Sequence, residues 1–141
     1  KDDELVGILP EGTRRGKGSK IPSLHAGAAF IAKMGKAPLL PMTVRNAEYV
    51  KQKGQRIHFP KITVEYGSPV VLSDFDFLPK ADRLEGCTWY AMRECFALSR
   101  QITAEEVDMV SLFPETRDYA EIFRDNPIPV RTPAEAIAAC R

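Results

Sequence analysis

The sequence is poor in histidine, and several patterns that identify common functional classes are absent. Only two histidines occur in the 141 residues, His25 and His58, so a histidine base within this chain must be one of them. The three cysteines form no C-x-x-C pair, and with two histidines they make no plausible zinc set. Their odd number argues against a disulfide framework and fits a reducing, cytosolic environment. No apolar run approaches the roughly 20 residues that cross a bilayer.

The balance of charge is uneven along the chain. The formal net charge is +1, but residues 1–61 carry twelve Lys and Arg against five Asp and Glu. Residues 62–141 carry eight against fourteen. A basic first half indicates an anionic ligand or surface, and the alternative is a solvated surface with uneven charge.

The pattern of apolar and turn residues predicts an α/β domain followed by a helical tail. Apolar runs predict strands at 5–9, 38–44 and 62–66, with a short extension at 70–72. The run at 5–9 is nearly continuous, as in a strand covered on both faces of a parallel sheet. Helices are predicted at 23–36 and 82–102, and shorter ones begin at Thr103 and Thr132. Asp82 with Glu85 resembles a capping box for the long helix.

The most informative segment is the loop at residues 11–20. A strand that ends in a glycine-rich loop before a helix is a common phosphate-binding arrangement, because backbone N–H groups and the helix N-terminus face the ligand. Arginine adds two parallel hydrogen bonds to a phosphate. Four cations lie within seven positions of this loop, namely Arg14, Arg15, Lys17 and Lys20.

Three other interpretations of this loop were weighed. A nucleotide P-loop needs G-x-x-x-x-G-K-[ST], but the spacing from Gly12 to Gly16 is one residue too short and Lys17 precedes Gly18. A nucleic-acid contact would use the same cations, but no aromatic residue lies between Leu9 and Phe30 to stack on a base. The third interpretation is a solvated basic turn.

Four segments in order resemble the glycerolipid acyltransferases, the 1-acylglycerol-3-phosphate acyltransferase family. The string Glu11-Gly12-Thr13-Arg14 is similar to the family's E-G-T-R motif and follows an apolar run. The segment 24–32 resembles its helix that begins with a basic residue and Gly-Ala. Residues 37–44 resemble a motif centred on a proline, here Pro41, and residues 64–70 resemble a strand that ends in Gly-x-Pro. The resemblance covers roughly residues 5–72.

The resemblance implies a fold and a set of acceptor-binding residues. It implies a glycerol-3-phosphate acyltransferase-like fold, incomplete here, with a partly parallel sheet and flanking helices in residues 1–72, and a helical extension of unknown role in 73–141. Glu11, Gly12, Thr13 and Arg14 would bind the glycerol-phosphate end of the acceptor, with Arg14 on the phosphate and Glu11 fixing Arg14 or a neighbouring N–H. Arg15, Lys17 and Lys20 would add positive charge, and Pro41 would shape the acceptor pocket.

The family's catalytic motif H-x-x-x-x-D does not occur in this sequence. Its histidine takes the proton of the acceptor hydroxyl, and its aspartate orients the imidazole. Phe30 stands five positions after His25 and Thr63 five after His58, so neither histidine fits. The resemblance places that motif upstream of E-G-T-R, before Lys1, and no catalytic residue is expected within this chain. The string Phe113–Arg117 looks like E-G-T-R but lacks its glycine, and it is interpreted as the end of a helix.

The resemblance therefore predicts an acyltransferase that makes phosphatidic acid from 1-acylglycerol-3-phosphate. Its acyl donor would be a thioester of acyl carrier protein or coenzyme A, without a metal or redox cofactor, and no nucleic acid would take part. A location at the cytoplasmic face of the membrane is expected, either peripheral or through an anchor outside this chain. Two alternatives remain: another glycerol-phosphate or lysophospholipid acceptor, and a non-catalytic module that binds anionic lipid surfaces.

Overall fold

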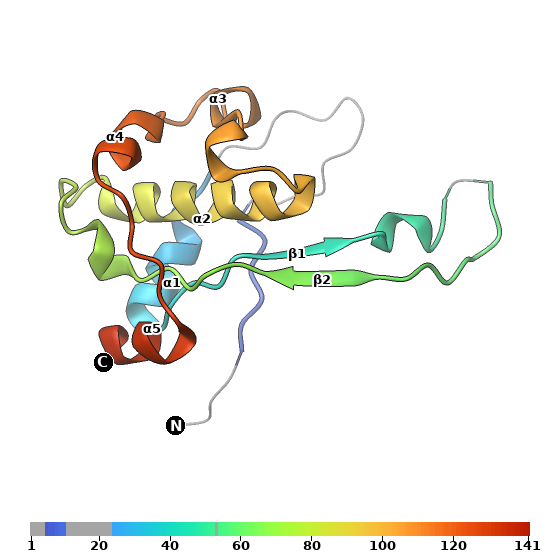
Figure 1. Cartoon of the computed structure of the whole chain (residues 1–141), viewed down its shortest axis with the longest axis horizontal. Coiled ribbons are helices and arrows are strands. Elements are labelled where there is room, and N and C mark those ends of the chain that lie inside the picture. Colours follow the sequence, from blue (N-terminus) through green and yellow to red (C-terminus); the bar gives the residue numbers. More distant parts are fainter. Residues whose placement is uncertain (1–4, 11–23, 53) are drawn as a thin grey trace.

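The computed structural model describes residues 5–10, 24–52 and 54–141. A long helix, α2 (Arg83–Arg100), runs through the middle of the molecule. A β-hairpin runs alongside it and projects past its C-terminal end (Figure 1). Helix α1 (Gly27–Gly35) and strand β1 (Met42–Arg45) both pack against α2. The remaining elements are β2 (Thr63–Tyr66), α3 (Met109–Leu112), α4 (Ala120–Asp125), α5 (Pro133–Cys140), and the 3-10 helices η1 (Ala47–Tyr49), η2 (Leu72–Phe75) and η3 (Ala104–Glu106).

The hydrophobic core surrounds α2 and is built from segments both before and after it. Six rings from η2, the turn after it, α2 and the α4 region pack together, and we call them the aromatic cluster: Phe75, Phe77, Trp89, Tyr90, Tyr119 and Phe123. Phe123 lies at its centre, with ring centroids 5.5–6.3 Å from those of the other five. Edge-to-face pairs of this kind stabilise a core beyond the area that they bury. A bidentate ion pair between Arg131 and Asp74 fastens the last segment to η2.

The two strands form an antiparallel hairpin. Met42 pairs with Tyr66 and Arg45 with Thr63, and an isolated bridge joins Leu39 to Val70. The Arg45 guanidinium forms an ion pair with Glu65 at 2.6 Å and donates to the carbonyl of Leu98 in α2 at 3.3 Å. The predicted strands at 38–44 and 62–66 thus overlap β1 and β2, and the partly parallel sheet stays a prediction because these two strands pair only with each other in the described residues.

The predicted strand at residues 5–9 is wrong. The segment forms no strand, and Leu5 and Leu9 are 91% and 83% exposed. A strand needs the backbone of a neighbour to satisfy its N–H and C=O groups. Within the described residues, the two strands pair with each other and neither pairs with this segment.

The helices predicted at 23–36, at 82–102 and from Thr132 are confirmed in position, whereas the helix predicted to begin at Thr103 and end at Pro114 is instead two separate ones, η3 and α3. One of the start signals is also wrong. Helix α1 falls within 23–36 and ends where Lys36 adopts a left-handed backbone with φ of 48°, while Ser23 lies outside the described residues. Thr103 with Glu106 and Thr132 with Glu135 form capping boxes at η3 and α5. Helix α3 ends at Leu112, before Pro114, and the string at 113–117 lies in the turn after it.

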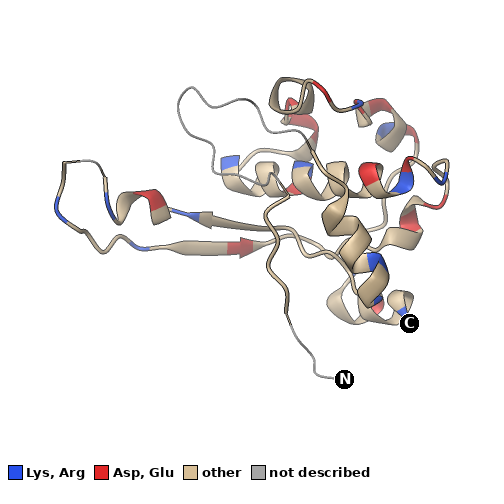
Figure 2. Ribbon diagram, turned by 180° about the vertical axis from the view of Figure 1, so that it is seen from behind, with Lys and Arg blue, Asp and Glu red and all other residues tan. Residues whose placement is uncertain are grey.

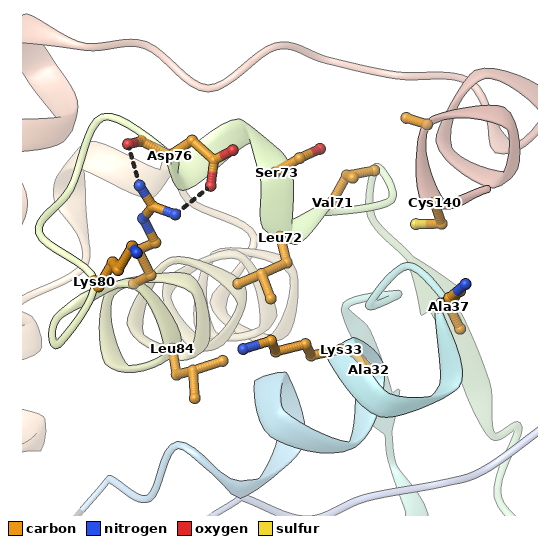
Figure 3. A pocket seen from close by; sticks show the side chains of 13 residues that line it. Ala32, Lys33, Ala37, Val71, Leu72, Ser73, Asp76, Lys80, Leu84 and Cys140 are labelled. Carbon is orange, nitrogen blue, oxygen red and sulfur yellow. Dashed lines mark hydrogen bonds and ion pairs between the residues drawn. The ribbon is translucent and has the colours of Figure 1, made fainter.

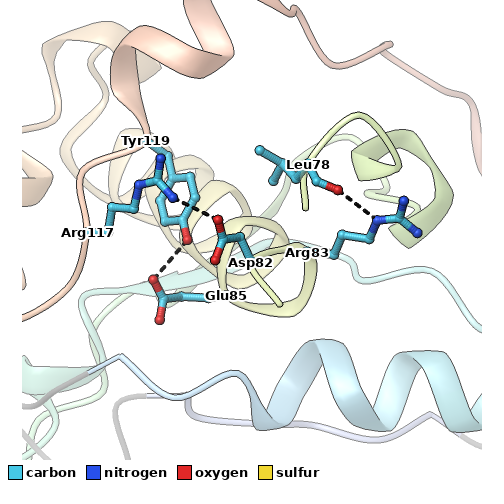
Figure 4. Close-up of polar contacts among 6 residues, drawn as sticks. All are labelled: Leu78, Asp82, Arg83, Glu85, Arg117 and Tyr119. Atoms are coloured by element: carbon cyan, nitrogen blue, oxygen red, sulfur yellow. Dashed lines mark hydrogen bonds and ion pairs between the residues drawn. The ribbon is translucent and has the colours of Figure 1, made fainter. Parts of the chain in front are cut away.

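The capping box predicted from Asp82 and Glu85 is not formed. The Asp82 side chain caps no N–H of α2 and instead accepts from Arg117 at 2.7 Å, while Glu85 accepts from the hydroxyl of Tyr119 at 2.9 Å (Figure 4). Beside them, Arg83 donates to the carbonyl of Leu78. Partners more than 30 positions away in sequence thus take the two carboxylates that a local pattern would assign to the helix end.

Candidate functional site

Most of the predicted phosphate site falls outside the described residues. This applies to Glu11, Gly12, Thr13, Arg14, Arg15, Lys17 and Lys20. On the far side of this loop, Leu24 is buried in the core, and α1 begins three residues later.

Pro41 is buried at the base of the hairpin. Its carbonyl accepts a hydrogen bond from the N–H of Gly67 at 2.8 Å. A β-carbon on Gly67 would lie 3.3 Å from Leu98 Cδ1 and 3.4 Å from Pro41 Cβ, so the glycine permits a close approach of three segments. The proline-centred and Gly-x-Pro segments of the resemblance therefore lie side by side. Pro41 is placed as a packing residue here, and its role in an acceptor pocket remains a proposal.

The two histidines are both exposed and lie on different elements. His25 precedes α1, and His58 lies on the returning limb of the hairpin, where its N–H donates to the carbonyl of Val50 at 2.9 Å. His58 is thus a surface residue that belongs to neither strand.

A cavity of about 490 Å³ lies between α1, η2, the start of α2 and α5, and the sequence analysis missed it. Three lysines from two separate segments surround it: Lys33 and Lys36 at the end of α1, and Lys80 before α2. Lys33 extends toward the apolar side chains of Leu72 and Leu84 (Figure 3). No local motif reveals this site, because its cations come together only when α1 packs beside η2.

The electrostatics of this cavity favour an anion. Arg83 also lines it, but its guanidinium is occupied by Asp76, at 2.9 Å to Oδ1 and 2.8 Å to the carbonyl, and by the carbonyl of Leu78 at 3.0 Å. Within the described parts of the chain, the three lysines form no ion pair. Cys140 lies on the opposite wall, where burial, with a smaller contribution from the carboxylate of Asp74, raises the pKa of its thiol.

A second polar feature is the buried guanidinium of Arg93 on α2. It lies over the rings of Trp89 and Tyr90, at 5.4 and 5.0 Å from their centroids, and 3.6 Å from Glu94. Its Nε has no hydrogen-bond partner in the structure as described. Burial raises the pKa values of Tyr90 and Glu94 around it. These contacts fix a charge within the helical core by cation–π attraction.

Other kinds of site were sought in the same residues. In the described ranges, no group of three or more His, Cys, Asp or Glu side chains is placed to hold a metal ion. No described helix is both long enough and apolar enough to span a bilayer.

Comparison with known proteins gives one informative similarity. Over 88 residues, 62% of this chain, the sequence is 38% identical to a 1-acyl-sn-glycerol-3-phosphate acyltransferase of Bacillus subtilis (strain 168). The chain is similar to part of an acyltransferase. The match covers 41% of that relative, so the chain spans less than half of its length. No protein-family model matches the chain, and no solved structure matches it.

The aligned stretch is longer than residues 5–72, the segment in which the motifs were found. The resemblance to the glycerolipid acyltransferases is therefore supported by a match that is longer than the segment in which the motifs lie. The similarity supports an acyltransferase function in general.

Proposed function

We propose that this chain is part of an enzyme that transfers a fatty acyl group to 1-acylglycerol-3-phosphate and forms phosphatidic acid. The observation that carries the proposal is the 38% identity over 62% of the chain to an enzyme named for that acceptor. The acyl donor would be a thioester of acyl carrier protein or coenzyme A. The acceptor hydroxyl attacks the thioester carbonyl and the thiol leaves, so the reaction itself requires no metal or redox cofactor.

The proposed contribution of this chain is the acceptor-phosphate site. Arg14 would bind two phosphate oxygens in parallel, and Arg15, Lys17 and Lys20 would offset the remaining charge. Glu11 would hold Arg14 in place, because a carboxylate repels a phosphate but orients a guanidinium. The basic first half of the sequence is consistent with this role.

The base that takes the proton from the acceptor hydroxyl would not be a histidine of this chain. His25 and His58 are exposed, and neither has an acid five positions later. We therefore expect no acyl transfer from residues 1–141 alone. Turnover of 1-acylglycerol-3-phosphate by this polypeptide would overturn that expectation.

Binding of glycerol 3-phosphate, measured by calorimetry, tests the phosphate site directly. Arg14→Gln should weaken binding at least tenfold, because charge-assisted hydrogen bonds are worth about 1.5–3 kcal/mol. Arg14→Lys should keep part of the affinity, since it retains the charge but loses the two-pronged contact. Arg56→Gln, which removes an equal charge from the exposed hairpin, is the matched control and should bind normally. Equal affinity in wild type and Arg14→Gln would contradict the proposal.

Two experiments distinguish the alternative functions from the proposed one. Comparing lysophospholipid and glycerol-phosphate acceptors with the intact enzyme would identify a different acceptor of the same family. A non-catalytic lipid-binding module is favoured by the uncovered apolar side chains in the basic half, such as Leu5 and Leu9. Lipid binding that falls steeply with salt, in a chain that does not bind glycerol 3-phosphate, would favour that module.

A further inference from the structure

The segment between the two strands, residues 46–62, projects away from the helical body, and we call it the arm (Figure 1). Its two limbs are joined by hydrogen bonds from the N–H of His58 to the carbonyl of Val50 and from Asn46 Nδ2 to the carbonyl of Lys61, both at 2.9 Å. A hairpin of this kind has little core of its own, and two strands alone are marginally stable in water. The arm therefore presents its side chains outward.

Large apolar side chains on the arm are exposed to solvent. Phe59 is 94% exposed, and Ile57, two residues earlier, is 59% exposed. Tyr49 on the opposite limb is half exposed, and so is Ile62 at the base of the arm. Single exposed apolar residues are ordinary, but several on one projecting segment indicate a surface that is covered in use.

The same segment is strongly cationic. The sequence of the arm contains Lys51, Lys53, Arg56 and Lys61 against the single acid Glu48. Lys51, Arg56 and Lys61 are exposed and form no ion pair in the part of the chain that the structure describes. Figure 2 shows Lys and Arg positions along the arm, whereas most Asp and Glu positions lie on the helical body.

We propose that the arm binds the surface of an anionic lipid bilayer. Ile57, Phe59 and Tyr49 enter the boundary between headgroups and acyl chains, and the cations contact lipid phosphates. A bilayer accounts for both features, since stable attachment needs an apolar anchor as well as a basic patch. A nucleic acid would pair with the cations and leave the aliphatic side chains in water. The inference rests on the proposed function, because an enzyme with a lipid acceptor must work at a membrane.

Co-sedimentation of the full chain with vesicles tests this proposal. Vesicles of phosphatidylcholine with 30% phosphatidylglycerol should bind the chain, and pure phosphatidylcholine should bind it much more weakly. We expect Lys51→Gln and Arg56→Gln each to lower the partition coefficient about fivefold, because each basic residue near an anionic surface contributes about 1 kcal/mol. Phe59→Ser should lower it by about tenfold, which is the order expected from removing a buried aromatic anchor.

Matched controls come from the helical body. Val130→Ser changes a residue that is 82% exposed outside the arm, and Arg124→Gln removes an exposed cation from α4. Both should bind vesicles as wild type does. If the controls lose as much binding as the arm variants, attachment is general electrostatics and the proposal is wrong.

A second measurement reports insertion directly. In a Phe59→Trp variant the added indole should shift its emission to the blue with anionic vesicles and be quenched by brominated lipid. Trp89 is buried in the core and gives the constant background. If the Phe59→Trp variant sediments with the vesicles but its emission is neither shifted nor quenched, a surface other than the arm holds the chain. That result would overturn the proposal.

The outcome for the arm can be separated from the outcome for the phosphate site. Arg14→Gln should lose binding of glycerol 3-phosphate and keep binding to vesicles, whereas Phe59→Ser should do the reverse. If Arg14→Gln abolishes vesicle binding and the arm variants do not, lipid attachment occurs through the loop and the arm proposal fails. If glycerol 3-phosphate never binds but the arm variants release the vesicles, the proposed phosphate site fails and the arm proposal stands.

Discussion

The helical body buries its large apolar side chains, whereas the hairpin leaves many of its own exposed to solvent. In the body, Phe75, Trp89 and Tyr119 are almost completely buried in the aromatic cluster. In the hairpin, apolar side chains on β1, β2 and the arm remain about half exposed or more, among them Met42, Val44, Val64, Tyr66 and Phe59. The motifs that resemble an acyltransferase all lie in the first 72 residues, and all six residues of the cluster lie beyond them. The segment with the functional motifs is therefore the one that does not complete its own core.

This difference indicates where stability and where binding reside. The body gains its stability from apolar area removed from water and from ring packing. The hairpin is held by a short ladder, by Arg45 and by the contact of Gly67 with Pro41. Substitutions in the two regions should differ sharply in their effects on folding.

The largest effect is expected at the centre of the aromatic cluster. Phe123→Ala should lower the free energy of unfolding by about 3–5 kcal/mol, because it leaves a cavity among five rings. Urea unfolding followed by circular dichroism would measure this loss, and Phe123→Leu should recover part of it. A loss below about 1 kcal/mol would show that the body does not depend on the cluster.

An intermediate effect is expected from the buried thiol of Cys87. Burial, aided by the Asp74 carboxylate, raises its pKa from 9.0 to about 12. The unfolded thiol ionises first as the pH rises, so this stability is complete below pH 9 and is lost between pH 9 and 12. At pH 10.5 the wild type should have lost about 2 kcal/mol relative to Cys87→Ala, compared with their difference at pH 7.

Urea titrations of both proteins at the two pH values would test this dependence. Parallel curves for wild type and Cys87→Ala between pH 7 and 10.5 would contradict it. Tyr119, whose pKa is also raised by burial and by its hydrogen bond to Glu85, adds an alkaline loss that is common to both proteins.

The smallest effect is expected on the arm. Phe59→Ala should change the free energy of unfolding by no more than about 0.5 kcal/mol, because the ring is 94% exposed and contributes little to the core. The same urea titration serves as the measurement. A loss as large as that of Phe123→Ala would mean that Phe59 packs against the protein and would remove the contrast between the two regions.

Local sequence patterns predicted the elements whose causes are local. The threonine–glutamate pairs at η3 and α5 satisfy their own helix ends, and the apolar spacing of α2 is visible in any window of the sequence. Asp82 and Glu85 have the same pattern, but Arg117 and Tyr119 from a distant segment bind them instead. The three-lysine cavity is assembled from separate segments, so no motif could reveal it.

The segment at residues 5–9 shows where a local pattern predicts the wrong structure. Its composition predicts a covered strand, but a strand also needs a partner strand, and in the described residues β1 and β2 pair only with each other. The loop that carries the functional prediction, at residues 11–20, was inferred wholly from residue types and their order. Residue types thus predict the chemistry of a site, while its geometry depends on neighbours that a pattern does not name.

The contact of Arg45 with α2 marks the place where the hairpin joins the helical body. Arg45 joins β1 to Glu65 on β2 and to the carbonyl of Leu98, in the last turns of the helix. The hairpin is therefore joined to the C-terminal end of α2, whereas the rings that α2 gives to the aromatic cluster, Trp89 and Tyr90, lie in its first half. The projecting segment and the packed core thus meet the same helix at different ends.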